Sequence, residues 1–340
     1  MKFTIGKDAI VKSLKPAASV AGKKSSLLIL SYIRFSAGEQ RLTVYATDAE
    51  MGFEARHAVE VEEPGAICLP AKVLHDIIAS LPDGPVGFTT DDRLAVTIRS
   101  ESGFYRIIGL SPEEFPGSVI AADNVLLPVP ASDLRNLISM VLHAASTDVT
   151  RANICGALLQ LAGADLLMVA TDGHCLAKAL RGVVGPELAG LATDCGLAKG
   201  VIIPRRALQE LLYILDKRLE ASVSIGATGN MFILRIFSEA LTFHVALIDG
   251  DYPDYGRVLP KEVTAPVVIR RAPLLESLRR LNILAGEHGV LDLGLEGNTL
   301  RLTVDNPDLA MENHPLQIMN ASALEITEKD YVGIVMPLKM

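Results

Sequence analysis

Tryptophan is absent from the 340-residue sequence, and aromatic residues make up only 5% of it. Leucine, isoleucine, valine and alanine must therefore fill the cores, and a hydrophobic fraction of 49% is sufficient for that. No stretch reaches the roughly 18 apolar residues of a membrane span, and the first residues lack the apolar region of a signal peptide. We therefore expect a cytoplasmic protein without membrane contact. A length of roughly 100–200 residues per domain predicts two or three domains.

Cysteine is also scarce. The four cysteines form no C-x-x-C pair, which disfavours a zinc site or a redox motif; they are Cys68, Cys155, Cys175 and Cys195. Reduced, partly buried thiols are the expected state in a cytosolic protein. The sequence also lacks the G-x-G-x-x-G, P-loop, G-x-S-x-G and H-E-x-x-H motifs. We therefore expect no metal and no other cofactor.

A segment of apolar strand, Asp-centred turn and second strand recurs three times. It reads LTVYATDAEMGFEA at 42–55, LLMVATDGHCLAKA at 166–179 and LRLTVDNPDLAMEN at 300–313. The turn aspartates are Asp48, Asp172 and Asp305, which lie 124 and 133 residues apart. A period of this length indicates repeated domains instead of a solenoid of short units.

Predicted helices flank these strand pairs in a constant order. A first helix precedes each pair, at 7–14, 132–143 (with Ser132 as N-cap) and 273–284, and a second helix follows Pro70 and Pro204. The predicted fold class is α+β, with domains 1–121, 122–260 and 261–340. Segment 184–200 is expected to be a loop insertion. The third repeat has only 77 residues from Thr264 to Met340, so its second half is expected to be largely missing.

No surplus of basic charge exists, because 32 basic and 40 acidic residues leave a formal net charge of −8. Taken alone, this argues against a simple basic nucleic-acid-binding domain. However, the five predicted helical regions hold 16 basic and 7 acidic residues; they are 7–24, 72–81, 132–151, 205–218 and 270–286. On one shared surface they would attract phosphates without reading bases. The simpler alternative is that basic residues favour helix surfaces in general.

The pair Asp172 and His174 allows two interpretations. An aspartate and a histidine two residues apart could perform acid–base chemistry. However, Asp-Gly is a common tight-turn pair between strands, and the first repeat has Thr47-Asp48-Ala49-Glu50 at the same place, without a histidine. A structural aspartate that caps the turn is therefore favoured over an enzyme.

Four motifs resemble a known family when they are taken together and in order. They are Met1–Thr4 (MKFT), Ala170–Ala177 (ATDGHCLA), 251–261 (DYPDYGRVLPK) and Val335–Leu338 (VMPL). This combination resembles the bacterial DNA polymerase III β subunit. The resemblance implies three similar clamp domains, and a homodimeric ring with helices lining a central hole around double-stranded DNA and antiparallel sheets outside. It also implies a non-catalytic processivity factor that tethers the DNA polymerase III catalytic subunit, is opened by a clamp loader and binds other proteins with clamp-binding motifs.

The resemblance and the basic helices together nominate site residues. The predicted DNA contacts are Lys23, Lys24, Arg151, Arg205, Arg206, Arg279 and Arg280. The predicted partner-peptide groove consists of Ile154, Thr171, Gly173, His174, Leu176, Pro253, Arg257, Val258, Val335, Met336, Pro337 and Leu338. The predicted dimer interface joins Leu74, Ile78 and Ile107 to Ile283 and Leu284 of the other subunit.

Two departures from the family pattern leave an alternative open. Cys175 stands where the family usually has an arginine, which removes a positive rim from the groove. The short third domain reduces the number of lining residues and leaves ring closure undecided. The alternative function is therefore a monomeric clamp-like module that binds polymerase-type peptides without encircling DNA.

Overall fold

The computed structural model describes residues 1–22, 27–117, 125–183, 185, 194–259, 270–285, 290–296, 299–305 and 316–317. These residues belong to two compact units, Met1–Tyr255 and Gly256–Met340, which are treated one at a time below. Every described strand pair is antiparallel. The α+β prediction is therefore confirmed for these parts of the chain.

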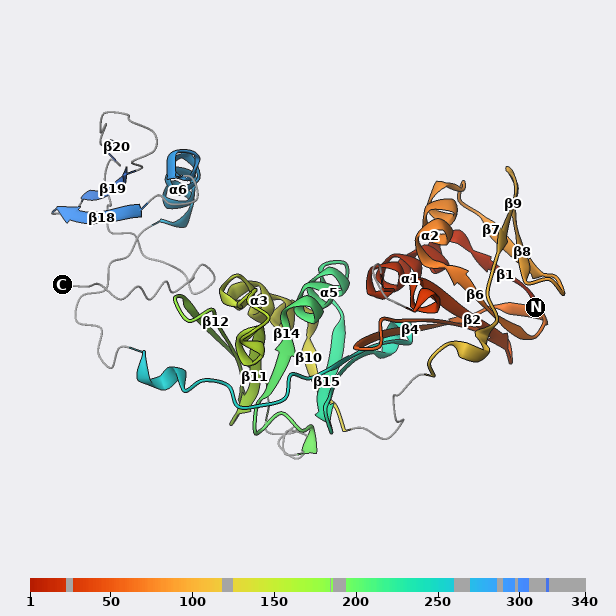
Figure 1. Ribbon diagram of the computed structural model, residues 1–340, viewed down its shortest axis with the longest axis horizontal. Coiled ribbons are helices and arrows are strands. Elements are labelled where there is room, and N and C mark those ends of the chain that lie inside the picture. Colours follow the sequence, from red (N-terminus) through yellow and green to blue (C-terminus); the bar gives the residue numbers. More distant parts are fainter. Residues whose placement is uncertain are drawn as a thin grey trace. The chain divides into compact units, whose positions relative to one another are not determined.

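The described strands of the first unit form three sheets (Figure 1). A five-stranded sheet has the order β5 (Glu60–Glu63), β1 (Lys2–Gly6), β7 (Pro85–Thr90), β8 (Ala95–Ser100) and β9 (Gly103–Ile108). A four-stranded sheet has the order β13 (Leu176–Gly182), β12 (Asp165–Thr171), β11 (Gly156–Ala162) and β14 (Val201–Pro204). Buried and more exposed positions alternate along strand β2 (Tyr32–Gly38), as expected when one face covers a core.

The largest sheet joins the first two repeats. Its eight strands are, in order, β10 (Leu127–Pro130), β15 (Ser222–Thr228), β16 (Met231–Ile236), β17 (Leu241–Ala246), β4 (Met51–Ala58), β3 (Arg41–Thr47), β2 (Tyr32–Gly38) and β6 (Gly65–Pro70). The seam between the repeats is the pairing of β17 with β4, where Phe243 lies opposite Phe53. Both rings are fully buried, so backbone hydrogen bonds and apolar packing together hold the seam.

Four α-helices form a row on one side of these sheets. They are α1 (Lys7–Val20), α2 (Ala71–Ser80), α3 (Ala131–Val141) and α5 (Arg205–Asp216). Helix α1 packs against α2 and α5, and α5 packs against α3, so the row is continuous (Figure 1). The helices cover the core with apolar stripes, of which Leu208, Leu211 and Leu215 in α5 are an example.

Proline precedes three of these helices. Pro70, Pro130 and Pro204 are the N-caps of α2, α3 and α5, where the ring restricts φ and the missing N–H is not needed. The predicted cap at Ser132 is therefore wrong, because α3 already begins at Ala131 and its first turn has no side-chain cap. Short 3-10 helices among the described residues serve as connectors, at Leu28–Ser31, Pro112–Glu114, Leu142–Ala144, Ala152–Ile154, Phe237–Glu239 and Tyr255–Arg257.

In the second unit, helix α6 (Arg271–Ala285) precedes the hairpin of β18 (Val290–Glu296) and β19 (Thr299–Asp305). Strand β20 (Leu316–Gln317) pairs with β19. The predicted first helix and strand of the third repeat are thus present. The prediction that its second half is missing falls largely outside the described residues.

Candidate functional site

The turn Thr171–Cys175 connects β12 to β13 and is held by its own side chains. Asp172 Oδ1 accepts hydrogen bonds from the amides of His174 (2.8 Å) and Cys175 (2.6 Å). Thr171 Oγ1 donates to the Cys175 carbonyl (2.6 Å) and accepts from the Gly173 amide (3.1 Å). The amide of Cys175 and the other backbone donors hold the pKa of Asp172 below its usual range. The interpretation of Asp172 as a structural cap is therefore confirmed.

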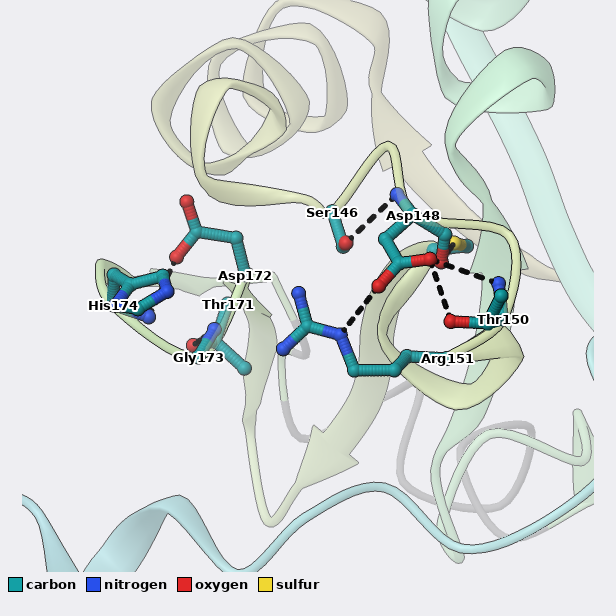
Figure 2. A network of polar contacts seen from close by, with 9 residues as sticks. Ser146, Asp148, Thr150, Arg151, Thr171, Asp172, Gly173 and His174 are labelled. Carbon is teal, nitrogen blue, oxygen red and sulfur yellow. Dashed lines mark hydrogen bonds and ion pairs between the residues drawn. The ribbon is translucent and has the colours of Figure 1, made fainter.

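A second loop, Ser146–Cys155, lies beside this turn (Figure 2). Asp148 organises it: its Oδ1 accepts from the Thr150 hydroxyl (2.6 Å) and amide (3.0 Å), and its Oδ2 accepts from Arg151 Nε (3.1 Å). The Asp148 amide donates to Ser146 Oγ (3.1 Å), and the Cys155 thiol donates to the Asp148 carbonyl (2.8 Å). The hydrogen bonds from Thr150 and the ion pair with Arg151 lower the pKa of Asp148.

The loop and the turn meet where Arg151 reaches Gly173. Figure 2 shows the guanidinium of Arg151 directed toward Thr171 and Gly173. A Cβ atom added to Gly173 would lie 2.9 Å from Arg151 Nη1, and Gly173 has φ +92°. A side chain is thus disfavoured at this position both by the backbone conformation and by the neighbouring guanidinium.

The segment that leaves the second repeat is attached to the same region. Asn153 Nδ2 donates to the Asp251 carbonyl (3.4 Å), and Lys178 Nζ lies 5.8 Å from the centre of the Tyr255 ring. Burial raises the pKa of the Tyr252 hydroxyl to about 12. The loop Ser146–Cys155, the turn Thr171–Cys175 and the segment Asp251–Tyr255 are together called the Asp172 site below.

The predicted groove residues of the first unit lie in or beside this site. Ile154 and Thr171 are buried, Leu176 is half-buried, and Gly173, His174 and Pro253 are exposed. The exposed residues Arg257 and Val258 belong to the second unit. The remaining four predicted residues, Val335, Met336, Pro337 and Leu338, lie outside the described residues. The groove as a whole therefore stays a prediction.

The first repeat contains the same turn with different surroundings. Asp48 Oδ1 accepts from the amides of Glu50 (3.0 Å) and Met51 (2.7 Å), and Thr47 Oγ1 donates to the Met51 carbonyl (2.7 Å). Here the second carboxylate oxygen is paired, because Asp48 Oδ2 lies 2.6 Å from Nη1 of Arg206 in α5. The Asp48 side chain is only 6% exposed, so this ion pair forms part of the seam between the repeats.

Several predicted DNA contacts have other roles in the structure. Arg206 binds Asp48, and Arg205 Nη1 donates to the carbonyl of Ala145. Arg151 belongs to the Asp172 site, through Asp148, and is not part of the helix row. On α6 of the second unit, Arg279 and Arg280 are exposed. The loop residues Lys23 and Lys24 lie outside the described residues.

Two of the predicted interface residues face inward. Leu74 and Ile78 are one helical turn apart on α2 and are fully buried in the core of their own repeat, so they present no side-chain surface to a second subunit. Ile107 on β9 is half-buried, while Ile283 and Leu284 on α6 are 79% and 43% exposed. The exposed apolar side chains of β9 are instead Phe104, Tyr105 and Ile108.

The network around Asp148 was not predicted from the sequence, although the residue spacing contains a signal for it. The run Ser146–Arg151 contains a serine two residues before an aspartate, and this aspartate two residues before a threonine. Both spacings are typical of side chains that accept a backbone N–H two residues further on.

All four cysteines are free. Within the described residues, no helix is long and apolar enough to span a membrane, and no three His, Cys, Asp or Glu side chains gather as a metal site.

Comparisons with known proteins match the first two repeats to two successive domains of one family. Residues 1–120 match the family model for the N-terminal domain of the DNA polymerase III beta subunit, and residues 128–254 match the model for its central domain. A beta sliding clamp of Synechococcus elongatus is 31% identical over 91% of this chain and 82% of its own length. A beta sliding clamp of Vibrio cholerae is 30% identical over 94% of this chain and 87% of its own length.

Solved structures show the same fold. The sliding clamp (DNA polymerase III subunit beta) from Pseudomonas aeruginosa, bound to griselimycin, has a TM-score of 0.81 and 29% identity over 93% of this chain and 84% of that chain. The sliding clamp from Bacillus subtilis has a TM-score of 0.83 at 24% identity. The resemblance inferred from the four sequence motifs is thus confirmed. The chain belongs to the family of the bacterial DNA polymerase III beta subunit, the sliding clamps.

Proposed function

We propose that this sliding clamp acts as a homodimeric ring that encircles double-stranded DNA and tethers the replicative polymerase. It performs no chemical step of its own. Tethering raises the effective concentration of the polymerase at the DNA, so rebinding outcompetes loss. The observation that carries the proposal is the continuous helix row α2–α1–α5–α3 on one side of sheets that join two repeats (Figure 1).

Exposed basic residues on the helix row support its role as the DNA-facing surface. Lys12, Lys15, Lys72 and Lys217 are exposed on or directly after these helices. None of these four lysines forms an ion pair with a described residue, whereas Arg135, Arg206 and Arg218 are paired with carboxylates. Lysine binds phosphate as a point charge without reading bases, and this suits a ring that must slide. The lysines of the row therefore join Arg279 and Arg280 as proposed DNA contacts.

The free edge of the five-stranded sheet supports dimerisation. Strand β9 pairs only with β8 among the described strands, and its Phe104 and Ile108 side chains are 69% and 76% exposed. Unpaired strand edges with apolar side chains are ready sites for pairing with another chain. We assign the first-domain side of the ring interface to β9, and the partner side to the region of Ile283 and Leu284.

The Asp172 site is the proposed docking place for partner proteins. The exposed residues Gly173 and His174 lie at a rigid, hydrogen-bonded turn, and a short peptide can bind such a preorganised surface at a lower entropic cost. The proposed ligands are motifs of the polymerase catalytic subunit, the clamp loader and other clamp-binding proteins. The monomeric alternative is not favoured, because the matches extend over 82% and 87% of the two relatives described above.

Retention on DNA of different topology tests encirclement. The chain, loaded with a clamp loader, is expected to remain on a nicked circular duplex and to leave when that duplex is linearised. Equal retention on both forms would contradict encirclement, whatever the affinity for DNA.

The molar mass of the protein in solution tests the proposed dimer interface at β9. Ile108→Asp is expected to convert a dimer at micromolar concentration into a monomer, measured by light scattering, because it places a charge on the apolar edge. Val149→Asp is the matched control, since Val149 is 84% exposed on a loop of the second repeat. A dimer that survives Ile108→Asp would contradict the assignment of β9.

A further inference from the structure

The turns at Asp48 and Asp172 occupy the same place in the first two repeats. The contact that Asp48 makes therefore indicates what Asp172 can bind. The backbone amides at the third and fourth positions after the threonine donate to Oδ1 of Asp48 in one turn and of Asp172 in the other. In both turns the threonine hydroxyl donates to the carbonyl that closes the turn. The two carboxylates are therefore held in the same way, and in each of them Oδ2 takes no part in the turn itself.

In the first repeat this second oxygen binds an arginine. Asp48 Oδ2 and Arg206 Nη1 are 2.6 Å apart and form an ion pair. The arginine comes from a segment more than a hundred residues away in the sequence. The turn has thus already been used, within this chain, as a receptor for a cation from another domain.

In the second repeat the carboxylate has different surroundings. One carboxylate oxygen of Asp172 is directed away from the other labelled side chains (Figure 2), and no ion pair to Asp172 occurs within the described residues. The nearest guanidinium, that of Arg151, is bound to Asp148 through Nε (3.1 Å). Because Asp148 pairs with Arg151, Asp172 has no arginine or lysine partner within the described residues, and the charge of the neighbouring His174 acts on it instead.

We propose that Asp172 binds an arginine or lysine side chain of the partner peptide, as Asp48 binds Arg206. This inference rests on the proposed peptide-binding function of the site and adds a rule of selection to it. The apolar anchor residues of the peptide provide the buried area, and a basic residue beside them forms an ion pair with Asp172. Partners with a basic residue next to their apolar anchors are bound more tightly than otherwise equal partners without one.

A peptide panel tests this rule. The probes are acetylated, amidated six-residue peptides with two leucines as apolar anchors and one arginine placed in turn at each remaining position. Each has a partner in which citrulline replaces arginine, which removes the charge but keeps the shape. Binding to the full chain is measured by isothermal titration calorimetry at 50 mM and 300 mM salt. At one position, arginine is expected to bind about fivefold more tightly than citrulline at low salt and with a smaller advantage at high salt.

The variant Asp172→Asn tests whether the carboxylate of Asp172 causes this advantage of arginine. The amide oxygen of asparagine can still accept the two backbone hydrogen bonds, so the turn is retained. The variant is expected to abolish the advantage of arginine over citrulline and to leave citrulline binding unchanged. Asp48→Asn is the matched control in the equivalent turn, and it should keep the full advantage.

The outcomes separate this inference from the proposed function. If every peptide binds but arginine never exceeds citrulline, or if Asp172→Asn leaves the advantage intact, the inference is overturned and peptide binding stands. If no peptide of the panel binds the wild-type chain, peptide binding at this site fails first. A lower melting temperature of Asp172→Asn, with an unchanged arginine advantage, would confine the role of Asp172 to holding its own turn and would also overturn the inference.

Discussion

The turns at Asp48 and Asp172 are locally alike, but their surroundings differ. Both turns use an aspartate and a threonine to hold the backbone. In the first turn the Asp48 side chain is only 6% exposed and pairs with Arg206 at the seam between the repeats, while Ala49 and Glu50 are exposed. In the second turn Gly173, His174 and Cys175 are exposed, and Arg151 of the same repeat lies against Gly173. The same turn thus joins two repeats in one place, and in the other it forms part of the proposed docking site.

The strand that follows the first turn, β4, begins with buried residues. Gly52 lies directly under His244 of β17, and a Cβ atom at Gly52 would be 2.1 Å from the imidazole Cε1. His244 is 2% exposed, and its ring stacks on Tyr45 with a centroid distance of 6.4 Å. The seam therefore depends on a histidine that must remain neutral.

The largest expected effect is a loss of seam stability in acid. Burial lowers the pKa of His244 from 6.5 to about 4, although nearby Glu54 opposes this shift. Above pH 6.5 the histidine is neutral in both the folded and unfolded states. Between pH 6.5 and 4 only the unfolded state binds the proton, so the free energy of unfolding falls as the pH falls. The total loss attributable to His244 is about 3 kcal/mol.

Urea denaturation followed by circular dichroism at pH 7.5 and pH 4.5 measures this loss. His244→Gln is the control, because glutamine does not titrate and lacks this contribution. His57, whose pKa burial also lowers, is retained in both proteins and cancels in the comparison. Equal pH dependence of the two proteins would show that His244 does not couple the seam to protons.

The two aspartates should differ when each is replaced by alanine. Either substitution removes a carboxylate that accepts two backbone amides, at a cost of about 1 kcal/mol. Asp48→Ala also removes the partner of Arg206 from a buried position, which adds about 1–2 kcal/mol. Thermal or urea denaturation should therefore show Asp48→Ala to be the less stable variant. Equal stabilities would mean that the ion pair contributes nothing to the seam.

A double-mutant cycle isolates that ion pair. Arg206→Ala and Asp48→Ala are combined, and the coupling free energy is expected to be about 1 kcal/mol because Arg206 remains half exposed. Coupling close to zero would assign the difference between the two aspartates to the turn alone.

Much of the fold could be predicted because it depends on short-range patterns. The Asp-centred turns, the strands on both sides of them and the starts of the proline-led helices follow from alternation and helix-start signals. Helix α1 was predicted to end at Leu14, but it continues to Val20 despite the internal Pro16. Burial of Pro16, Ala17 and Val20 against the core offsets the hydrogen bond that the proline removes.

The roles of the arginines could not be predicted in the same way. Arg206 lies on a basic helix and is therefore predicted to contact DNA. In the structure it pairs with Asp48 instead, at the seam where β17 of the second repeat pairs with β4 of the first. Such a contact depends on a register between strands almost two hundred residues apart. Leu74 and Ile78 belong to the apolar stripe of α2, which faces the core, and their assignment to the dimer interface came from the family resemblance.

The smallest expected effects come from the residue at the third position of each turn. Ala49 has φ +81° and Gly173 has φ +92°, so both occupy the left-handed region. Ala49→Gly relieves the strain but increases the entropy of the unfolded chain, so the free energy of unfolding should change by less than about 0.5 kcal/mol. Gly173→Ala introduces the same strain and also pushes a methyl group against Arg151, at a cost of about 1 kcal/mol.

The comparison of these two variants separates backbone strain from the contact with Arg151. Gly173→Ala combined with Arg151→Ala should recover part of the lost stability, since the methyl group then has space, while the strain at φ remains. No recovery in thermal denaturation would mean that strain alone explains the cost. Recovery would establish that the exposed turn is rigid because the loop Ser146–Cys155 packs against it, whereas the turn at Asp48 is rigid because a neighbouring domain does.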